Sequence, residues 1–261
     1  MDQTSHTTQS HLKNTCKVCK GLGYIIEHKI VSEYDQNTPV EFATPCPACR
    51  GNQSDHRTGI PQMFSEADMG KFDFTRYGGG TGNIEQIIFS FWKNYDQWEK
   101  SIKGLYIWSK TKGSGKTFLA CCIASSVQVK HGKKIRFISS TNYLKKIIEA
   151  GKREPGQQDI LFAYQNCDLL ILDDFGGERK GEWQDQELLY LIDYRINNGK
   201  PIIATAGCSM TDLKNDGRIV DRLGKICIPI HLPEISIRKQ KASIENEAFM
   251  KKILGKSTGT L

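Results

Sequence analysis

The sequence predicts an α/β protein, in which a parallel β-sheet carries helices on both faces and a small cysteine-containing segment precedes it. Three observations predict this fold. Short apolar runs typical of strands alternate with helical runs through most of the chain, and this alternation favours a parallel sheet. A glycine-rich turn joins one such strand to the following helix. Two close pairs of cysteines stand near the N-terminus.

The length, charge and apolar content limit the classes of protein that fit this sequence. The chain has 261 residues and a net charge of +7, a length that suits one full α/β domain with a small appendage. The mildly basic charge is compatible with contact to a nucleic-acid backbone and equally with ordinary solubility. No apolar stretch approaches the ~20 residues that span a bilayer. Residues 1–14 are polar and lack an apolar signal core, so we expect a cytoplasmic protein with no membrane partner.

Two Cys-x-x-Cys pairs, with 26 residues between them, predict a structural zinc site. The four expected thiolate ligands are Cys16, Cys19, Cys46 and Cys49. Four thiolates leave no open position on Zn²⁺, so the site would stabilise the segment and not catalyse a reaction. Unligated thiols or a redox pair are the alternatives. We therefore predict a flexible tail over 1–14 and a zinc-binding domain over 15–58, closed by a short hairpin.

A linker arm over 59–83 and a helix over 84–100 are expected next. The arm mixes apolar anchors with polar spacers, which indicates a segment that lies on the following domain. From Ile84 to Trp98 the apolar and aromatic residues recur at helical spacing, and such a stripe usually packs into a core. Adenine stacking near the start of this helix is the alternative.

A glycine turn after the strand Leu105–Trp108 predicts a phosphate-binding loop. The turn contains Gly113, Ser114, Gly115, Lys116 and Thr117. Backbone N–H groups in such a turn can surround phosphates at the positive end of the next helix. Lys116 would then reach the outer phosphates of ATP, and the hydroxyl of Thr117 would bind Mg²⁺. Lys110 stands where the full pattern has a glycine, so a lysine-rich surface turn is the alternative.

An acidic pair follows a second buried strand. Four apolar residues, 169–172, lead to Asp173 and Asp174, and parallel strands deliver such carboxylates at their carboxyl ends. We expect Asp173 to hold Mg²⁺ and Asp174 to orient and polarise the attacking water.

The remaining runs complete an ATPase domain expected over 84–261. The expected helices are Ala120–Val129, Tyr143–Ala150, Gln158–Gln165, Trp183–Asn197, 217–223 and Ser236–Leu254, and the expected strands are Ile135–Ile138, Pro201–Thr205 and Ile226–Ile230.

Together these parts resemble the bacterial replicative-helicase loader family (DnaC/DnaI type), a branch of the AAA+ ATPases, with the insertion-sequence helper ATPases (IstB type) as close relatives. The resemblance covers Ile60 to about Lys241. The stretches that carry it are GLYIWSKTKGSGKTFLA, CDLLILDDFGGE, LIDYRINNGKPIIATA and GRIVDRL. It implies an AAA+ P-loop domain of three layers, and the cysteine pairs also resemble the zinc knuckles that precede many loader ATPase domains.

The resemblance also implies roles for individual residues. Lys116 and Thr117 belong to Walker A, and Asp173 and Asp174 to Walker B. Arg222 matches the arginine that such proteins insert into a neighbouring subunit's nucleotide site. Arg238 matches the sensor arginine that binds the nucleotide.

The basic residues leave alternatives open. For Arg218 and Arg222 the alternative is a solvated face or a salt bridge. Lys145, Lys146, Lys152 and Arg153 either face a DNA strand or form a solvated helix face.

The implied function is ATP-dependent loading of a hexameric replicative helicase, with single-stranded DNA and ATP-dependent self-assembly as further partners. Gly207 stands where relatives carry a polar sensor residue, so together with Lys110 it predicts ATP binding with slow hydrolysis. One rival is a transposition helper ATPase that assembles on duplex DNA. Another is a zinc-bearing nucleic-acid adaptor with a degenerate ATP site.

Overall fold

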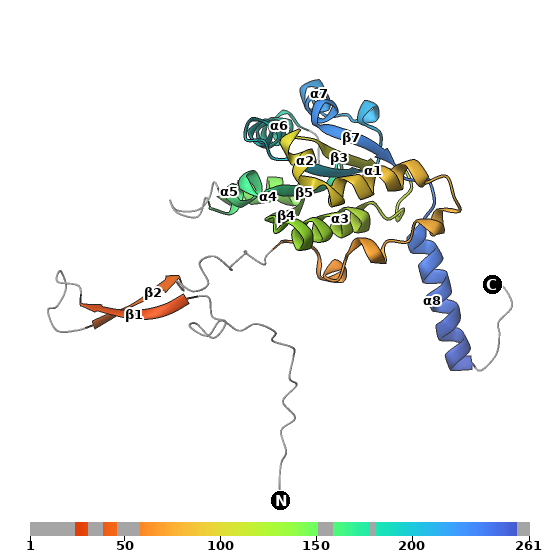
Figure 1. The fold of residues 1–261 in the computed structure, drawn as a ribbon, viewed down its shortest axis with the longest axis horizontal. Helices are drawn as coiled ribbons and strands as arrows, with labels where there is room; N and C mark the ends of the chain where they lie inside the picture. The colour runs from red at the N-terminus through yellow and green to blue at the C-terminus, as the bar shows by residue number, and fades with distance from the viewer. Residues whose placement is uncertain (1–23, 31–38, 46–57, 151–158, 178–180, 255–261) are drawn as a thin grey trace, which may run out of the picture. The chain divides into compact units, whose positions relative to one another are not determined.

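A computed structural model describes residues 24–30, 39–45, 58–150, 159–177 and 181–254 (Figure 1). Contacts within the chain divide it into two units, Met1–His56 and Arg57–Leu261.

The first unit contains an antiparallel hairpin. Strand β1, Tyr24–Ile30, pairs with β2, Pro39–Pro45, and the register places Tyr24 opposite Pro45. The short hairpin expected from the sequence is therefore present. Polar residues such as Glu27 and Lys29 do not interrupt its ladder, because the hydrogen bonds join backbone groups. The predicted zinc ligands Cys16, Cys19, Cys46 and Cys49 lie outside the described residues.

The second unit is built on a five-stranded parallel sheet, as the sequence predicts. Its strands are β3 (Gly104–Trp108), β4 (Ile135–Ser139), β5 (Leu169–Phe175), β6 (Ile202–Ala206) and β7 (Cys227–His231), in the order β4-β5-β6-β3-β7. The helices from the glycine turn onward are α3 (Lys116–His131), α4 (Ser140–Ala150), α5 (Asp159–Asn166), α6 (Glu182–Asn197), α7 (Gly217–Ile226) and α8 (Ile237–Leu254).

Helices cover both faces of this sheet, and each face has its own core. Alternate strand residues enter opposite cores: Leu105 and Ile107 join one cluster, whereas Tyr106 joins the other. This alternation follows from the two-residue period of a strand. The first core also receives α3 and the helices before β3, and the second receives α4, α6 and α7. The fold is thus the three-layer arrangement that the sequence predicts.

The aromatic stripe before β3 forms two helices where one was expected. These are α1, Gly82–Lys93, and α2, Tyr95–Lys100. The break is at Asn94, whose φ of −118° and ψ of 34° depart from helical values, and asparagine is a weak helix former. The stripe still packs as expected, because Phe91 and Tyr95 are fully buried.

The arm before α1 lies on the sheet domain. It folds into three short 3₁₀ turns, Gln62–Phe64, Met69–Lys71 and Phe74–Tyr77. The ring of Phe72 lies 5.9 Å from that of Phe118 on α3, so the arm packs on the helix that follows the glycine turn.

Helix α8 extends away from the sheet (Figure 1). Within the described ranges, no helix combines the length and apolar character needed to cross a bilayer.

Candidate functional site

The carboxyl ends of three neighbouring strands, β5, β6 and β3, lie side by side at the C-terminal end of the sheet. Strand β6 lies between β3 and β5, and its last residue, Ala206, is in register with both Trp108 and Phe175. The loop after β3 and the acidic pair of β5 therefore reach the same end of the sheet, although more than 50 residues separate them in sequence.

The turn after β3 has the backbone of a phosphate-binding loop. Gly113 and Gly115 have φ values of +81° and +95°, which residues with a β-carbon rarely adopt. A β-carbon on Gly113 would also lie 2.8 Å from Cβ of Arg238. Helix α3 begins at Lys116 directly after this turn, so the free N–H groups of its first turn open toward the loop.

The Lys116 side chain curls back into this loop. Its ammonium group donates to the carbonyl oxygens of Ser109 (3.0 Å) and Thr111 (3.1 Å) and to the hydroxyl of Ser114 (3.2 Å). Burial lowers the pKa of Lys116, because the charged form loses solvation. The cation is therefore held at the centre of the loop, partly desolvated and close to where anionic phosphates would lie.

Thr117, in the first turn of α3, is in direct contact with Asp173, near the carboxyl end of β5. The Thr117 hydroxyl donates to Oδ1 of Asp173 at 2.8 Å, and the Thr205 hydroxyl donates to the same oxygen at 2.6 Å. Burial raises the pKa of Asp173, and the two hydroxyl hydrogen bonds offset part of that rise. A hydroxyl and a carboxylate are ligands that suit Mg²⁺, so these two residues fit the metal that the loop would require.

Asp174 is held in an unusual backbone conformation. Its φ is +52°, a left-handed value that a few residue types such as Asp tolerate at some cost. Its N–H donates to the Thr205 hydroxyl at 3.0 Å, and its carbonyl oxygen accepts from the hydroxyl of Ser140 at 3.1 Å. These two contacts fix the backbone, and the Asp174 side chain is exposed at the same end of the sheet as the loop.

Three residues at this site were not expected from the sequence. Thr205, almost fully buried, joins both acids of β5 through one hydroxyl. Tyr77, in the arm, donates to the Ser114 carbonyl oxygen at 2.6 Å. Glu234, in the segment between β7 and α8, binds the N–H groups of Lys110 and Thr111, which precede the glycine turn. A polar residue at the end of an apolar strand is a signal that could have singled out Thr205. The other two contacts have no sequence signal.

The two predicted arginines differ in their relation to the loop. Arg238 lies beside it, because its backbone N–H donates to the Gly113 carbonyl oxygen at 3.1 Å. Arg222 lies on α7 and pairs with Asp193 of α6 (2.9 Å) and with Asp221 (3.1 Å). The contacts of Arg222 thus belong to α6 and α7 and not to the phosphate loop.

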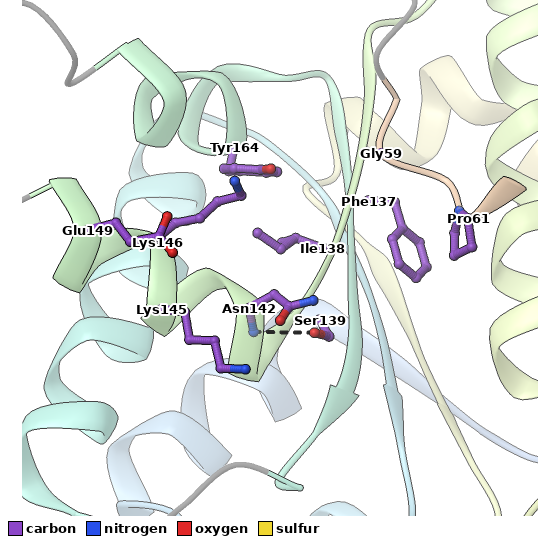
Figure 2. Close-up of a pocket in the computed structure, with 10 residues that line it drawn as sticks. All are labelled: Gly59, Pro61, Phe137, Ile138, Ser139, Asn142, Lys145, Lys146, Glu149 and Tyr164. Carbon is purple, nitrogen blue, oxygen red and sulfur yellow. Dashed lines mark hydrogen bonds between the residues drawn. The ribbon is translucent and has the colours of Figure 1, made fainter.

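A separate cavity of about 420 Å³ opens beside the edge strand β4 (Figure 2). Its lining includes Phe137 of β4, Asn142, Lys145 and Lys146 of α4, and Tyr164 of α5. Two of the basic residues considered for DNA contact therefore lie together at this cavity. The other two, Lys152 and Arg153, fall outside the described residues.

A metal-binding cluster of three or more His, Cys, Asp or Glu residues does not occur in the part of the chain that the structure describes. The predicted zinc cysteines fall outside that part.

Comparison with known protein families gives a match to the IstB-like ATP binding protein family over residues 104–243. The matched region contains the glycine turn, the acidic pair and both arginines.

The proteins of similar sequence include chromosomal replication initiator proteins. The chromosomal replication initiator protein DnaA of Herminiimonas arsenicoxydans is 29% identical over 132 residues, which are 48% of this chain and 28% of that protein. The chain thus spans little more than a quarter of that relative.

Two solved structures have the same fold. The DnaC helicase loader has a TM-score of 0.58 and 23% identity, over 66% of this chain and 99% of that one. DnaA bound to AMPPCP and single-stranded DNA has a TM-score of 0.56 and 19% identity, over 70% and 56%.

Proposed function

Because this chain belongs to the IstB-like ATP-binding protein family, and is thus a P-loop ATPase, we propose that it is an ATP-dependent loader of a replicative DNA helicase. The observation that carries the nucleotide part of the proposal is the meeting of Lys116, Thr117 and Asp173 at one end of the sheet. The loader part is supported by the fold that the chain shares with the DnaC helicase loader.

In this proposal the phosphates of ATP lie in the loop formed by Gly113, Ser114, Gly115, Lys116 and Thr117. Lys116 would turn from the loop carbonyls to the outer phosphates, and Thr117 and Asp173 would hold Mg²⁺. Asp174 would orient and polarise the attacking water, and Arg238 would bind the nucleotide from the start of α8. The desolvated position of Lys116 supports its role, since electrostatic attraction is stronger away from bulk water.

Arg222 acts between subunits in this account. An arginine that enters a neighbour's nucleotide site neutralises charge in the transition state and couples hydrolysis to assembly. Arg222 is bound to Asp193 and Asp221 within one subunit. Because both pairs are partly exposed, they are weak enough to exchange for a phosphate.

Hydrolysis is slow in this proposal, so ATP acts as a switch. Gly207 directly follows β6 and carries no side chain that could position water. A β-carbon at Gly207 would meet no atom within 4 Å, so steric crowding at that atom does not account for the glycine. Slow turnover leaves the ATP-bound assembly intact until the helicase or DNA changes it.

The N-terminal cysteines form a zinc site that stabilises the segment gripping the helicase. The β1–β2 register supports this, since Tyr24 and Pro45, which pair, are the strand ends that lead in sequence to the two cysteine pairs. Zinc stoichiometry should be close to one per chain. It should fall in Cys16→Ser and remain unchanged in Cys208→Ser, which alters a cysteine of the sheet domain.

Single-stranded DNA is proposed as a ligand of the assembled ATPase domains. Support comes from Lys145 and Lys146, which lie with Asn142 and Tyr164 at the cavity beside β4 (Figure 2). Cationic and aromatic side chains together suit a single strand, because they meet its phosphates and its bases. The likeness to DnaA bound to single-stranded DNA points in the same direction.

The loader proposal is tested by capture of a purified hexameric replicative helicase in the presence of a non-hydrolysable ATP analogue. We expect capture by the wild-type chain, and turnover that changes when the helicase or single-stranded DNA is added. ATP binding without helicase capture would contradict the loader role while leaving the nucleotide site intact.

A transposition helper is the second candidate, and the IstB-like family match favours it. Such a protein would assemble on duplex DNA and recruit a transposase. Turnover that responds to duplex DNA alone would support this candidate. If the wild-type chain bound no nucleotide, a zinc-bearing nucleic-acid adaptor would become the better account.

A further inference from the structure

Residues 109–111, which lead from β3 into the phosphate loop, are held by a carboxylate from a distant segment. Glu234 accepts hydrogen bonds from the backbone N–H groups of Lys110 (2.9 Å) and Thr111 (2.6 Å) and from the Ser109 hydroxyl (3.0 Å). Successive N–H groups that point at one anion form a nest, a common anion-binding arrangement of backbone. Here a side chain of the same chain fills the nest.

Glu234 is itself held in place by His231. His231 Nε2 lies 2.9 Å from Glu234 Oε1, and the imidazole stacks on the Trp108 ring with centroids 3.9 Å apart. Burial alone would raise the pKa of Glu234, but hydrogen bonds from His231, Thr111 and Lys110 outweigh it and hold this pKa far below its usual range. Glu234 is therefore a carboxylate at any pH near neutrality.

Two of these three residues, Ser109 and Thr111, are also bound by a cation. Lys116 donates to the carbonyl oxygens of Ser109 and Thr111, whereas Glu234 accepts from N–H groups in the same stretch. The side chain of Lys110 adds a contact to Asp212 at 3.6 Å. If Lys116 leaves its carbonyl partners for the phosphates of ATP, Glu234 remains as the contact that keeps this stretch in shape.

Position 110 departs from the full loop pattern without backbone strain. The full loop pattern has glycine there, and this chain has lysine. Among the described residues other than glycine, positive φ occurs at Ile102 and Asp174, so Lys110 has an ordinary negative φ. The turn at Lys110 therefore does not require the conformational freedom of glycine, and Glu234 is the acceptor of the N–H groups of Lys110 and Thr111.

We propose that Glu234 is a positioning residue for ATP binding, which fixes residues 109–111, at the entry to the phosphate loop, through the Ser109 hydroxyl and the N–H groups of Lys110 and Thr111. Glu234 does not touch the nucleotide in this account; it acts through the loop. The inference rests on the proposed nucleotide site, but the contact itself exists without nucleotide.

The experiment compares Glu234→Ala and Glu234→Gln with Glu245→Ala in the full chain. Glu245 is an exposed residue of α8 whose ion pair is with Lys241, so it controls for loss of a surface charge. The first measurement is hydrogen exchange of the amides of Lys110 and Thr111 without nucleotide. The second is the Kd of a fluorescent ATP analogue with Mg²⁺.

We expect faster exchange of both amides in Glu234→Ala and a Kd raised by about tenfold, which corresponds to about 1.4 kcal/mol. Turnover at saturating ATP should stay close to wild type, whereas the melting temperature should fall, because the lowered pKa of Glu234 means that its charge stabilises the folded chain. Glu234→Gln, which keeps an acceptor oxygen, should lie between, and Glu245→Ala should match wild type in every measurement. The Kd separates this account from a purely structural role, which would lower the melting temperature but leave the Kd of the folded protein unchanged.

Two results would overturn the proposal: wild-type exchange of the two amides in Glu234→Ala, or a wild-type Kd in a folded Glu234→Ala variant. If the wild-type chain binds no ATP, the proposed nucleotide site fails, and the exchange measurement still reports separately on the Glu234 contact.

Discussion

At the scale of single residues, Thr205 connects the two acids on which the proposed chemistry depends. Its hydroxyl donates to the carboxylate of Asp173 and accepts from the backbone N–H of Asp174. One side-chain oxygen thus sets the orientation of a metal ligand and supports the left-handed backbone of the next residue. Because β6 lies between β3 and β5, this strand is well placed to supply that oxygen.

Thr205→Val should weaken both stability and turnover. Valine keeps the shape but leaves the Asp174 N–H without its acceptor, a loss of about 1–3 kcal/mol in the free energy of unfolding. ATP turnover should fall by about tenfold, since Asp173 and Asp174 are no longer held together. Urea denaturation and steady-state ATPase assays measure the two effects. Thr211→Val, at an exposed position, is the control, and equal behaviour of the two variants would contradict the account.

Asp173→Asn should stabilise the nucleotide-free protein at neutral pH. The raised pKa of Asp173, caused mainly by burial, means that the native state binds this proton more tightly than the unfolded chain does. The stability that this group contributes is therefore present below the ordinary pKa of Asp and is lost as the pH rises through the raised native value. The amide oxygen of asparagine can still accept from Thr117 and Thr205 without a charge to desolvate.

The expected gain in unfolding free energy is about 0.5–2 kcal/mol at about pH 8. It should shrink as the pH falls toward the native pKa of Asp173, and Mg²⁺-dependent ATP binding should be lost at every pH. Thermal denaturation across this pH range provides the measurement. A variant less stable than wild type at about pH 8 would show that the carboxylate is not under a desolvation penalty.

At the scale of elements, a buried arginine on α6 binds backbone groups next to the starts of β5 and β6. Arg195 is fully buried and donates to carbonyl oxygens of Tyr164 (2.8 Å) and Cys167 (3.1 Å) at the end of α5. It also donates to the Pro201 carbonyl oxygen (2.7 Å), just before β6. One guanidinium therefore ties the starts of β5 and β6 to α6, and the five donors of arginine suit this task.

Arg195→Met should destabilise the domain by about 3 kcal/mol or more, because several buried carbonyl oxygens lose their donor at once. Arg195→Lys should recover only part of the loss, since an ammonium cannot reach carbonyls on both sides. Urea denaturation compares these variants with Arg218→Met, which removes an exposed arginine paired with Asp216. A loss no greater than that of Arg218→Met would show that the buried contacts contribute little.

At the scale of the whole molecule, we propose that the ATPase site is completed by a second subunit. Lys116, Thr117, Asp173 and Asp174 meet within one chain, but Arg222 makes its contacts on α6 and α7. A second subunit is therefore the natural source of the arginine at each nucleotide, as in the proposed mechanism.

Arg222→Ala should lower ATP turnover without changing ATP binding. ATP affinity should stay at the wild-type value, whereas turnover at high protein concentration should fall by about 10³-fold, the lower range for loss of an arginine supplied in trans. Arg218→Ala, one turn earlier on α7, is the matched control. Turnover measured over a range of protein concentrations tests this. An Arg222→Ala variant that keeps concentration-dependent turnover would exclude the role.

The sequence predicts the sheet and the positions of the phosphate loop and acidic pair, because their signals are local: apolar runs, glycines and adjacent acids. It does not predict that Tyr77, Thr205 and Glu234 support this site, since each acts through a contact between distant segments. Glu234 reaches Lys110 across more than 120 residues of chain. The break at Asn94 was also missed, because the apolar stripe continues through it.

The most direct test of the central claim is titration of a fluorescent ATP analogue, with Mg²⁺, into the wild-type chain, Lys116→Ala and Lys71→Ala. Lys71 is an exposed lysine of the arm, paired with Glu66, and controls for the loss of a positive charge. Saturable binding by the wild type and Lys71→Ala, with binding abolished in Lys116→Ala, is the result that the account predicts. Unchanged affinity in Lys116→Ala would contradict the assignment of the phosphate loop.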